Sequence, residues 1–556
     1  MPTPAELNRY FANVGKQRSL LITEPALKLQ SEITCPNTLM LTPTDPKEVY
    51  TIINGLKNSN ASGYDGVSHK VVRECANTLC SPLSEVINSS FAEGIFPQEM
   101  KQTVLRPVFK DGVTKTPENY RPIANVSTFS KIFEHAFANR LLNFLFQNNL
   151  LCKEQFGFIR GRNTTNAMVE FATNVINALD KKMNSVGVFI DLQKAFDCLD
   201  HKVLFDRLYA LGVRGVALDW IKSFLIGRKQ SVQVNNTTSE KLEATFGIPQ
   251  GSVLGPILFI LYINSLTNNF PNTHITMYAD DIALLFQDKS VENLEINCFL
   301  ELTTLYQYLN CNNLHINPSK TKSIPFSNRR VLHTNPLLFM NEHELRLESN
   351  CKYLGLIFDS SFTWKEQIDE LCSKVSSQLF LLSRFAKYQD NFLCRFIYTS
   401  LIESRLRYGI VLWGAASRTQ FLRVFRLQKR AVRILAGVRR REPCKTFFKI
   451  FRILTLPSLY IFEILMLYTF KLNSIQVGAD VHTYGTRACD LHRQTPHRLQ
   501  LSAALPQNLG PKLHNKLPRH IRLEKNPKKF KIYLQDHLLE TAFYSVEEFL
   551  NYSSDV

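Results

Sequence analysis

The sequence predicts an α+β fold in which an antiparallel sheet packs on helices. Residues 275–286, ITMYADDIALLF, place two short apolar runs around a compact polar centre, a pattern typical of two strands joined by a tight turn. Residues 186–190, VGVFI, form a continuous apolar run of the kind found in strands buried on both faces. Beyond residue 362 apolar side chains recur at helical spacing, which indicates a mostly helical second half.

Composition indicates a large protein with a polyanionic partner. The 556 residues are 45% hydrophobic and 21% charged, enough for several domains that each bury a core. A formal net charge of +18 favours nucleic acid as the partner, with an anionic membrane surface as the second candidate. The longest late apolar run, Leu459–Phe470, is too short to span a bilayer and contains Glu463, so we expect a soluble protein with no membrane partner.

The cysteines and the first residues indicate the cellular compartment. Twelve cysteines are scattered without a C-x-x-C pair, which argues against a zinc knuckle and against a disulfide framework. The opening residues, MPTPAELNRYF, lack the charged and then apolar build of a signal peptide. We therefore expect reduced thiols in an intracellular protein.

Three acidic residues suggest a site for divalent cations. Asp280 and Asp281 lie at the centre of the predicted hairpin, where adjacent carboxylates repel each other unless a cation lies between them. Asp191 ends the predicted buried strand, where an ionised carboxylate needs a partner or a metal. Carboxylates from two neighbouring strands are typical of two-metal phosphoryl-transfer sites. The alternatives are a solvated Asp-Asp turn and, for Asp191, a helix N-cap or an ion-pair partner.

The acids belong to an ordered series of motifs. Residues 188–201 (VFIDLQKAFDCLDH), 247–264 (GIPQGSVLGPILFILYIN) and 278–281 (YADD) together resemble the reverse transcriptase of non-LTR, LINE-type retrotransposons, and jockey-like elements most of all. The resemblance extends from about residue 61 to residue 359. It implies a right-hand polymerase fold and an RNA-directed DNA polymerase that acts in the nucleus on an RNA template, a DNA primer at the target DNA and dNTPs.

The resemblance also implies roles for the acids and a division of the chain. Asp191 and Asp280 would hold two Mg²⁺ ions, which Mn²⁺ can replace, and Asp281 would be a weaker ligand. The family protein has an endonuclease upstream, so we expect this chain to be a truncated copy or a fragment without it. The expected parts are a loosely ordered, proline-containing lead-in (1–45), an N-terminal extension (46–90), fingers and palm (91–360), a helical thumb (361–440) and a C-terminal region of unknown role (441–556).

The N-terminal extension and the fingers are the first segments in which the sequence predicts helices and strands. Helices are expected over 47–56 and 70–79, around the Gly-rich turn 61–66, which is either a plain loop or, by resemblance, a motif that touches the template. Strands 105–110 and 120–123 follow, and each carries a cation. Arg forks across phosphate oxygens and Lys acts as a point charge, so Lys110 and Arg121 suit a triphosphate. The resemblance gives them that role; the alternative is solvated surface charge. An amphipathic helix is expected over 130–146.

A basic, glycine-containing segment follows the fingers. Residues 155–165, QFGFIRGRNTT, combine flexible backbone with Arg160 and Arg162, which suits contact with a nucleic-acid strand. The resemblance implies that the two arginines contact the template. A bare basic loop is the alternative.

The segment after Asp191 carries a bulky residue that bears on sugar choice. By resemblance, Phe196 would lie beneath the sugar and exclude a 2′-hydroxyl, which favours dNTPs; core packing is the alternative. Asp197 and Asp200 are expected to cap a helix or to support the site rather than to act in catalysis. A helix is expected over residues 202–211.

Two further motifs are expected near the nucleotide. In the turn 246–252 Gly251 would allow close backbone approach to a ligand, and the start of the helix 253–266 offers free N–H groups. By resemblance, Gln250 and Gly251 line the nucleotide pocket; an ordinary loop-to-helix junction is the alternative. After a helix over 297–312, Lys320 would assist the pyrophosphate leaving group, or be a surface lysine.

The palm is expected to end in a strand, and the thumb to be helical. Residues 351–359 are strand-like, and Tyr353, Leu354 and Gly355 within them resemble a primer grip. Helices are expected over 364–387, 391–413, 419–435 and 459–472.

The C-terminal half is expected to contact nucleic acid, and two alternative functions compete with that of an RNA-directed DNA polymerase. The third helix of the thumb has one strongly cationic face, which suits an RNA–DNA duplex, or is a solvated face. A nucleic-acid-binding tail is expected after residue 440. One rival is a catalytically silent, retrotransposon-derived nucleic-acid-binding protein; the other is an RNA-dependent RNA polymerase, which Phe196 and the Tyr278-Ala279 pair disfavour.

Overall fold

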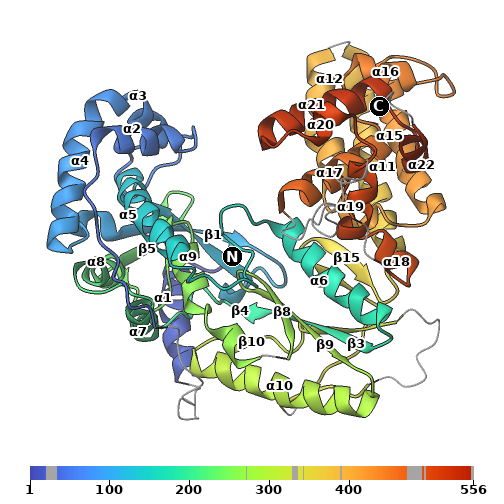
Figure 1. The fold of residues 1–556 in the computed structure, drawn as a ribbon. Helices are drawn as coiled ribbons and strands as arrows, with labels where there is room; N and C mark the ends of the chain where they lie inside the picture. Colours follow the sequence, from blue (N-terminus) through green and yellow to red (C-terminus); the bar gives the residue numbers. More distant parts are fainter. Residues whose placement is uncertain are drawn as a thin grey trace, which may run out of the picture.

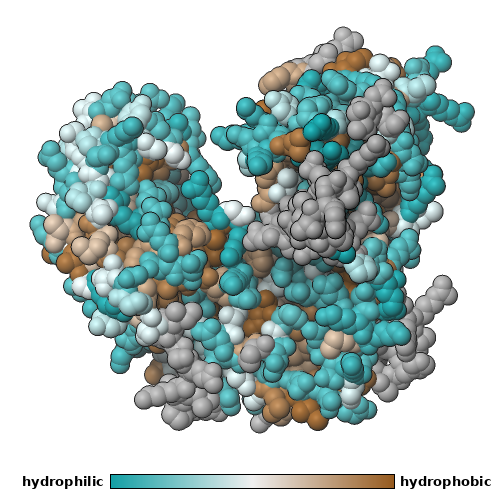
Figure 2. Space-filling view, in the orientation of Figure 1, coloured by the Kyte–Doolittle hydropathy of each residue, from teal (hydrophilic) through white to brown (hydrophobic). Residues whose placement is uncertain are grey.

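The computed structural model has two lobes above a mixed sheet and helix base, which confirms the α+β class (Figure 1). The blue N-terminal lobe and the orange and red C-terminal lobe stand apart, and the space-filling view shows a deep notch between them (Figure 2). The structure describes residues 1–20, 34–270, 272–327, 336–341, 343–388, 391–471, 491–493 and 496–552.

The palm is built on a four-stranded antiparallel sheet in the order β11-β3-β9-β8. The predicted buried strand is β3 (Asn184–Ile190), and the predicted hairpin is β8 (His274–Tyr278) with β9 (Asp281–Asp288). Strand β3 is central and apolar because it is covered on both faces. The other palm strands are β11 (Lys322–Phe326), β4 (Leu192–Gln193) and β10 (His315–Ile316), and the last two pair with each other.

Helices cover the palm sheet and connect it to the fingers. The predicted helices are present, with shifted ends. They are α5 (Thr128–Gln147), α7 (His201–Ala210), α9 (Leu254–Tyr262) with the 3₁₀ turn Leu266–Asn269, and α10 (Val291–Cys311). Two further helices, α6 (Thr164–Asp180) and α8 (Val216–Leu225), were not predicted. One apolar core runs from the N-terminal extension through α5, α7, α8, α9 and α10 to β8 and β9, so the extension and palm fold as a continuous body.

The fingers carry a second sheet in the order β2-β1-β5-β6. Strands β1 (Gln102–Phe109) and β2 (Tyr120–Val126) form the predicted antiparallel hairpin, and β1 also pairs in parallel with β5 (Lys229–Val234). Two short strands, β6 (Thr237–Thr238) and β7 (Leu242–Glu243), pair with β5. The helices of the extension are α2 (Pro46–Gly55), α3 (His69–Glu74) and α4 (Ala76–Glu93), and the 3₁₀ turns are Gln98–Lys101 and Pro117–Asn119.

The first residues are ordered, contrary to the loosely ordered lead-in expected over residues 1–45. Helix α1 (Pro4–Ser19) starts with a capping box in which Thr3 and Glu6 satisfy each other's backbone N–H groups. Its buried Leu7 and Phe11 pack in a small core with β1, β2 and β5. The expectation failed because proline here serves as the first residue of a helix, where its missing N–H costs nothing. Residues 21–33 lie outside the described residues.

The predicted strand over residues 351–359 is a hairpin. Strands β14 (Asn350–Tyr353) and β15 (Leu356–Asp359) pair antiparallel around a turn at Leu354 and Gly355, both of which have positive φ angles of 45° and 83°. The apolar run concealed the turn because Leu354 is not a typical turn residue. A further short pair is β12 (Phe339–Met340) with β13 (His343–Glu344).

The C-terminal lobe is helical as predicted, but the second thumb helix is broken. The expected helix 391–413 becomes α12 (Asn391–Ile397), the π-turn Tyr398–Glu403, α13 (Ser404–Arg407) and α14 (Ile410–Trp413). The break falls at Gly409, whose φ is 64° and where a Cβ would lie 2.2 Å from the Leu356 side chain. The preceding and following helices, α11 (Lys365–Phe385) and α15 (Arg418–Leu435), agree with the predictions, and the 3₁₀ turn Ala386–Tyr388 follows α11.

The chain after residue 440 packs onto the thumb rather than forming a tail. Helix α17 (Leu456–Lys471), expected over 459–472, contributes buried side chains to the same core as α11 and α15; residue 472 lies outside the described residues. The remaining helices are α16 (Lys445–Ile450), α18 (Gln500–Ala503), α19 (Pro506–His514), α20 (Arg519–Arg522), α21 (Pro527–Thr541) and α22 (Val546–Asn551). The apolar core thus crosses the expected thumb boundary without interruption.

Candidate active site

Three carboxylates meet where the palm sheet ends. Strand β3 is buried almost throughout and ends at Ile190, so Asp191 follows directly at the edge of the sheet. The register of β3 with β9, continued by one residue, places Asp191 opposite Asp281. Asp191, Asp280 and Asp281 line one cavity of about 610 Å³. The acids that the sequence singled out separately therefore face a common space.

The tip of the β8–β9 hairpin holds only one of its two aspartates. The sequence predicts both at the tip, but Asp281 pairs with Tyr278 and is the first residue of β9. Ala279 and Asp280 form the turn, and Ala279 has a φ of 55°. Asp280 thus projects from the turn, whereas Asp281 is held by the strand.

Gln155 supports this tip from outside the sheet. Its side-chain Oε1 accepts hydrogen bonds from the N–H groups of Gly157, at 2.8 Å, and Ala279, at 2.9 Å. The neighbouring Phe156 N–H donates to the Met277 carbonyl at 2.8 Å. Sequence reasoning missed this role because the contact joins residues 124 positions apart. Gln155 is buried, so its bonds act in a dry environment.

Burial and mutual repulsion raise the pKa of two of the acids. Burial is the larger cause at Asp280, and the Asp191 charge adds to it, while Arg121 and Lys110 act in the opposite direction. For Asp281, burial and then the charges of Asp280 and Asp191 raise the pKa to about 6. Water reaches Asp281 from the cavity, but the surrounding protein still desolvates its carboxylate. A divalent cation would relieve this concentration of negative charge.

The donor set fits a hard divalent cation. Mg²⁺ is commonly held by one or two carboxylates, while water and substrate phosphates complete its octahedral shell. Among the residues that the structure describes, no group of three or more His, Cys, Asp or Glu side chains is placed to hold a metal ion by itself. An open site, in which a triphosphate and water supply the remaining ligands, agrees with both points.

The residues predicted to bind the nucleotide mostly line the same cavity. Lys110 and Arg121 are exposed and come from the fingers hairpin, and Lys320 comes from the segment before β11. Phe196 and Gln250 also line the cavity, and the Phe196 ring stacks on Phe259 with centroids 4.5 Å apart. The core holds Phe196 in place while the residue also lines the cavity. Core packing and a position beneath the sugar, the two alternatives given for this residue, are therefore compatible.

Gly251 does not line the cavity. Its backbone lies close to another segment of the protein backbone, and not to the space where a ligand would bind. Its φ is 133°, and a Cβ there would lie 2.5 Å from the carbonyl oxygen of Ala124 in β2. The Ala124 N–H also donates to the Gln250 carbonyl at 2.8 Å. The glycine therefore lets the turn before α9 pair with the fingers strand, which differs from the backbone approach to a ligand that the sequence suggested.

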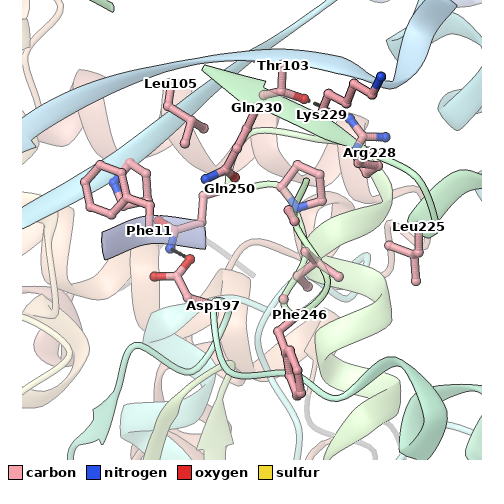
Figure 3. Close-up of a pocket in the computed structure, with 15 residues that line it drawn as sticks. Phe11, Thr103, Leu105, Asp197, Leu225, Arg228, Lys229, Gln230, Phe246 and Gln250 are labelled. Atoms are coloured by element: carbon pink, nitrogen blue, oxygen red, sulfur yellow. Dashed lines mark hydrogen bonds between the residues drawn. The ribbon is translucent and has the colours of Figure 1, made fainter. Parts of the chain in front are cut away.

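Gln250 is oriented by a buried acid (Figure 3). Its Nε2 donates to Asp197 Oδ1 at 2.7 Å, and the other oxygen of Asp197 is buried without a hydrogen-bond partner among the described residues. Burial raises the pKa of Asp197. A second cavity of about 50 Å³ lies beside this pair and is lined by Phe11 of α1. Asp197 thus supports Gln250 rather than capping a helix, whereas Asp200 caps α7 through the Lys202 N–H at 2.7 Å.

The template residues predicted near α6 have different surroundings. Arg160 is exposed, and its contact with the template stays a prediction. Arg162 is half-buried: its Nη1 donates to the carbonyls of Cys152 and Lys153 at 3.0 and 2.9 Å, and its guanidinium lies 5.6 Å from the Phe156 ring centroid. The structure therefore gives Arg162 an intramolecular role that the sequence did not indicate.

The predicted primer residues are divided between the core and a turn. Tyr353 is 4% exposed, and its ring packs on Phe171 and Phe189, so its side chain is a core residue and not a primer contact. Leu354 and Gly355 form the hairpin turn, and the Leu354 carbonyl accepts a hydrogen bond from the Tyr408 hydroxyl. The alternation of buried and exposed positions in β14 places Tyr353 inward.

The cavity wall also contains residues that the sequence did not predict, among them two residues of α1 and Lys194. Tyr10 and Arg18 come from α1, and Lys194 follows Asp191 by three positions. The first two were missed because residues 1–45 were expected to be loosely ordered. Only the basic and aromatic character of α1, PAELNRYFANVGKQRS, is a signal in the sequence.

Over most of the residues that form the site, the chain is similar to reverse transcriptases, a class of nucleic-acid polymerase. Residues 110–358 match the family model described as "Reverse transcriptase (RNA-dependent DNA polymerase)". The chain therefore carries a reverse transcriptase domain over these residues.

The curated proteins to which the chain is similar include RNA-directed DNA polymerases of non-LTR retrotransposons. The chain is 28% identical over 413 residues to a probable RNA-directed DNA polymerase from transposon BS of Drosophila melanogaster, covering 71% of this chain and 45% of that protein. It is 29% identical over 465 residues to the polymerase from mobile element jockey of Drosophila funebris, covering 78% and 49%. The chain thus spans less than half of the length of these curated relatives.

A viral polymerase of known structure is also similar at a low level. The RNA-dependent RNA polymerase of a human picorbirnavirus has a TM-score of 0.33 and 13% identity, over 64% of this chain and 60% of that one. Among the described residues, none of the helices has both the length and the apolar character needed to cross a bilayer.

Proposed function

We propose that the chain is the RNA-directed DNA polymerase of a non-LTR retrotransposon, which extends a DNA primer on an RNA template. The observation that carries the proposal is the cavity shared by three carboxylates of the palm and two cations of the fingers. A cavity lined by both carboxylates and cations suits a nucleoside triphosphate with its divalent cations. The family model and the retrotransposon relatives support this substrate class.

The reaction needs no nucleophile from the protein. The 3′-oxygen of the primer forms a bond to the α-phosphorus of the dNTP as its proton leaves, and the bond from that phosphorus to pyrophosphate breaks. Asp191 and Asp280, with Asp281 beside them, would hold two Mg²⁺ ions, which supply the charge that activates the 3′-hydroxyl and neutralises the triphosphate. Mn²⁺ could serve in place of Mg²⁺.

The chain's other residues bind and orient the nucleotide. Arg121 and Lys110 would contact phosphate oxygens from the fingers side, and Lys320 would supply a proton or a positive charge to the departing pyrophosphate. Phe196, held against Phe259, would block a 2′-hydroxyl and so favour dNTPs. The notch between the lobes would hold the template–primer duplex, and target-site synthesis would take place in the nucleus (Figure 2).

Primer extension on a heteropolymeric RNA template, with Mg²⁺ and dNTPs, tests the proposal. The natural chain should make full-length DNA. Asp280→Asn should reduce the rate by about 100-fold or more, because the loss of a metal ligand removes several kcal/mol of transition-state stabilisation. If neither protein makes DNA while both bind the template with the same salt dependence, the chain is a silent nucleic-acid-binding protein instead.

A Phe196→Val variant separates polymerase types. A smaller side chain should admit the 2′-hydroxyl, so the ratio of rNTP to dNTP incorporation should rise by about 10-fold or more. If the natural chain itself prefers rNTPs, it is an RNA polymerase, and the gate assigned to Phe196 is wrong.

A further inference from the structure

The N-terminal helix reaches the catalytic cavity from outside the reverse transcriptase domain. Tyr10 and Arg18 of α1 line the cavity together with the three carboxylates. The helix is fixed to the fingers sheet: Asn8 Nδ2 donates to the Glu240 carbonyl at 2.7 Å, and Gln230 Nε2 donates to Asn8 Oδ1 at 3.2 Å. These hydrogen bonds and the buried Leu7 and Phe11 hold α1 against the fingers sheet.

The other end of the helix is fixed to the palm. At Gly15 a Cβ would lie 2.6 Å from the carbonyl oxygen of Asp197, so the two backbones touch. The Gly15 carbonyl also accepts from Asn313 Nδ2 at 3.3 Å. Helix α1 thus spans from the fingers to the palm beside the cavity.

Arg18 holds the turn that follows the metal ligand Asp191. Its Nη1 donates to the Gln193 carbonyl at 3.0 Å, and its Nη2 donates to Gln193 Oε1 at 2.9 Å. The planar fork of Arg binds both acceptors at once, which fixes the backbone and the side chain of Gln193 together.

Lys194 is held by the same helix. Its ammonium lies 5.3 Å from the Tyr10 ring centroid and 5.9 Å from that of Phe11, and it donates to the Tyr120 carbonyl at 2.8 Å. Lys194 has a positive φ of 50°, a conformation that a side chain adopts only when its surroundings impose it. The aromatic pair and the carbonyl of β2 supply those surroundings.

We propose that α1 is a nucleotide-positioning element, which fixes the cavity wall at residues 192–195 through Arg18 and through the aromatic pair that holds Lys194. The ligand is the dNTP triphosphate with its divalent cation, so the inference rests on the polymerase activity proposed above. Arg18 is a positioning residue in this scheme, because it acts through Gln193.

Arg18→Ala should raise the KM for dNTP by about 10-fold, with kcat and the affinity for template–primer changed by less than about 3-fold. Arg18→Lys should recover part of the loss, since a lysine keeps the charge but cannot make both bonds. Arg9→Ala, an exposed arginine on the same helix, is the matched control and should behave as the natural chain. An unchanged KM in Arg18→Ala would overturn the inference.

Hydrogen exchange of the protein without substrate gives a readout that needs no activity. Amides of residues 192–198 should exchange faster in Arg18→Ala than in Arg9→Ala, while the strands of the palm sheet keep their protection. Equal exchange at this turn would contradict the proposed role, and so would a general loss of protection, which would make α1 only a structural brace. If the natural chain makes no DNA but the turn loosens as expected, the polymerase proposal fails while the positioning of the turn stands.

Discussion

At the scale of single residues, the pKa values of the two hairpin acids, Asp280 and Asp281, lie above the ordinary value. Burial and the neighbouring charges raise the pKa of Asp281 to about 6, and that of Asp280 is also raised. The unfolded chain releases the Asp281 proton near pH 4. Between these pH values the unfolded chain binds fewer protons than the native state, so the stability of the metal-free protein should fall as pH rises through this interval.

Asp281→Asn should reduce this fall, because asparagine has no proton to lose, while the smaller part that comes from Asp280 remains. Without metal, we expect the variant to melt at a higher temperature than the natural chain at pH 7.5 and at a similar temperature at pH 4. Thermal melting in the presence of a chelator measures both differences. An equal difference at the two pH values would show that charge repulsion at the hairpin does not limit stability.

Magnesium should counteract the loss of stability that the metal-free protein shows as pH rises. In the proposed site the cation binds the ionised carboxylates, so added Mg²⁺ should raise the melting temperature of the natural chain more at pH 7.5 than at pH 5. Titration of the melting temperature with Mg²⁺ at the two pH values tests this. Asp280→Asn should weaken the response, and a full response in that variant would place the cation elsewhere.

Gly251 offers a test of backbone geometry. Gly251→Ala would combine a φ of 133° with a Cβ 2.5 Å from the Ala124 carbonyl, so we expect a loss of about 1–3 kcal/mol of stability and a displaced Gln250. Urea unfolding and the KM for dNTP measure the two consequences. Gly55→Ala, at the end of α2 with no atom within 4 Å of the new Cβ, is the control and should be nearly neutral. An equally small effect at both positions would contradict the strain.

At the scale of elements, the β8–β9 hairpin depends on a residue of another segment. Gln155→Ala would leave the buried N–H groups of Gly157 and Ala279 without an acceptor, at about 1–3 kcal/mol for each group. Because Ala279 adjoins Asp280, we expect the rate of nucleotide addition to fall by about 10- to 100-fold.

Single-turnover primer extension at saturating dNTP measures this rate. Gln147→Ala, an exposed glutamine at the end of α5, is the control and should retain the natural rate. If Gln155→Ala also retains it, the hairpin is held by its strands alone.

At the scale of the whole molecule, the C-terminal region completes the thumb and contacts the palm. Helix α17 shares a core with α11 and α15. The N–H of Leu499, just before α18, donates to Asp180 Oδ1 at 2.7 Å, which joins the C-terminal lobe to the end of α6.

A chain that ends after residue 440 should therefore expose the thumb core and aggregate. A chain that ends after residue 552 keeps every described helix and should remain in solution. The fraction recovered after centrifugation and the melting temperature compare the two. A stable, monomeric 1–440 chain would show that the thumb folds without the region that follows it.

The local pattern of the sequence determined much of this protein. Strand β3, the β8–β9 hairpin and most palm and thumb helices follow from apolar periodicity, because burial on one face or two imposes a period on the chain itself. The same logic identified Asp191 and Asp280, since a carboxylate at the end of a buried strand or in a hairpin turn is conspicuous.

The tertiary structure decided what depends on contacts between distant residues. Arg162 binds carbonyls of its own loop, Tyr353 is in the core, and Gly251 meets a strand of the fingers. Helix α1 was not expected, because its buried face packs on β1, β2 and β5 and its Arg18 binds the turn after Asp191, all of which are distant in the sequence. Periodicity reports that a face is buried but not what covers it, so the partners of Gln155, Arg18 and Lys194 were visible only in three dimensions.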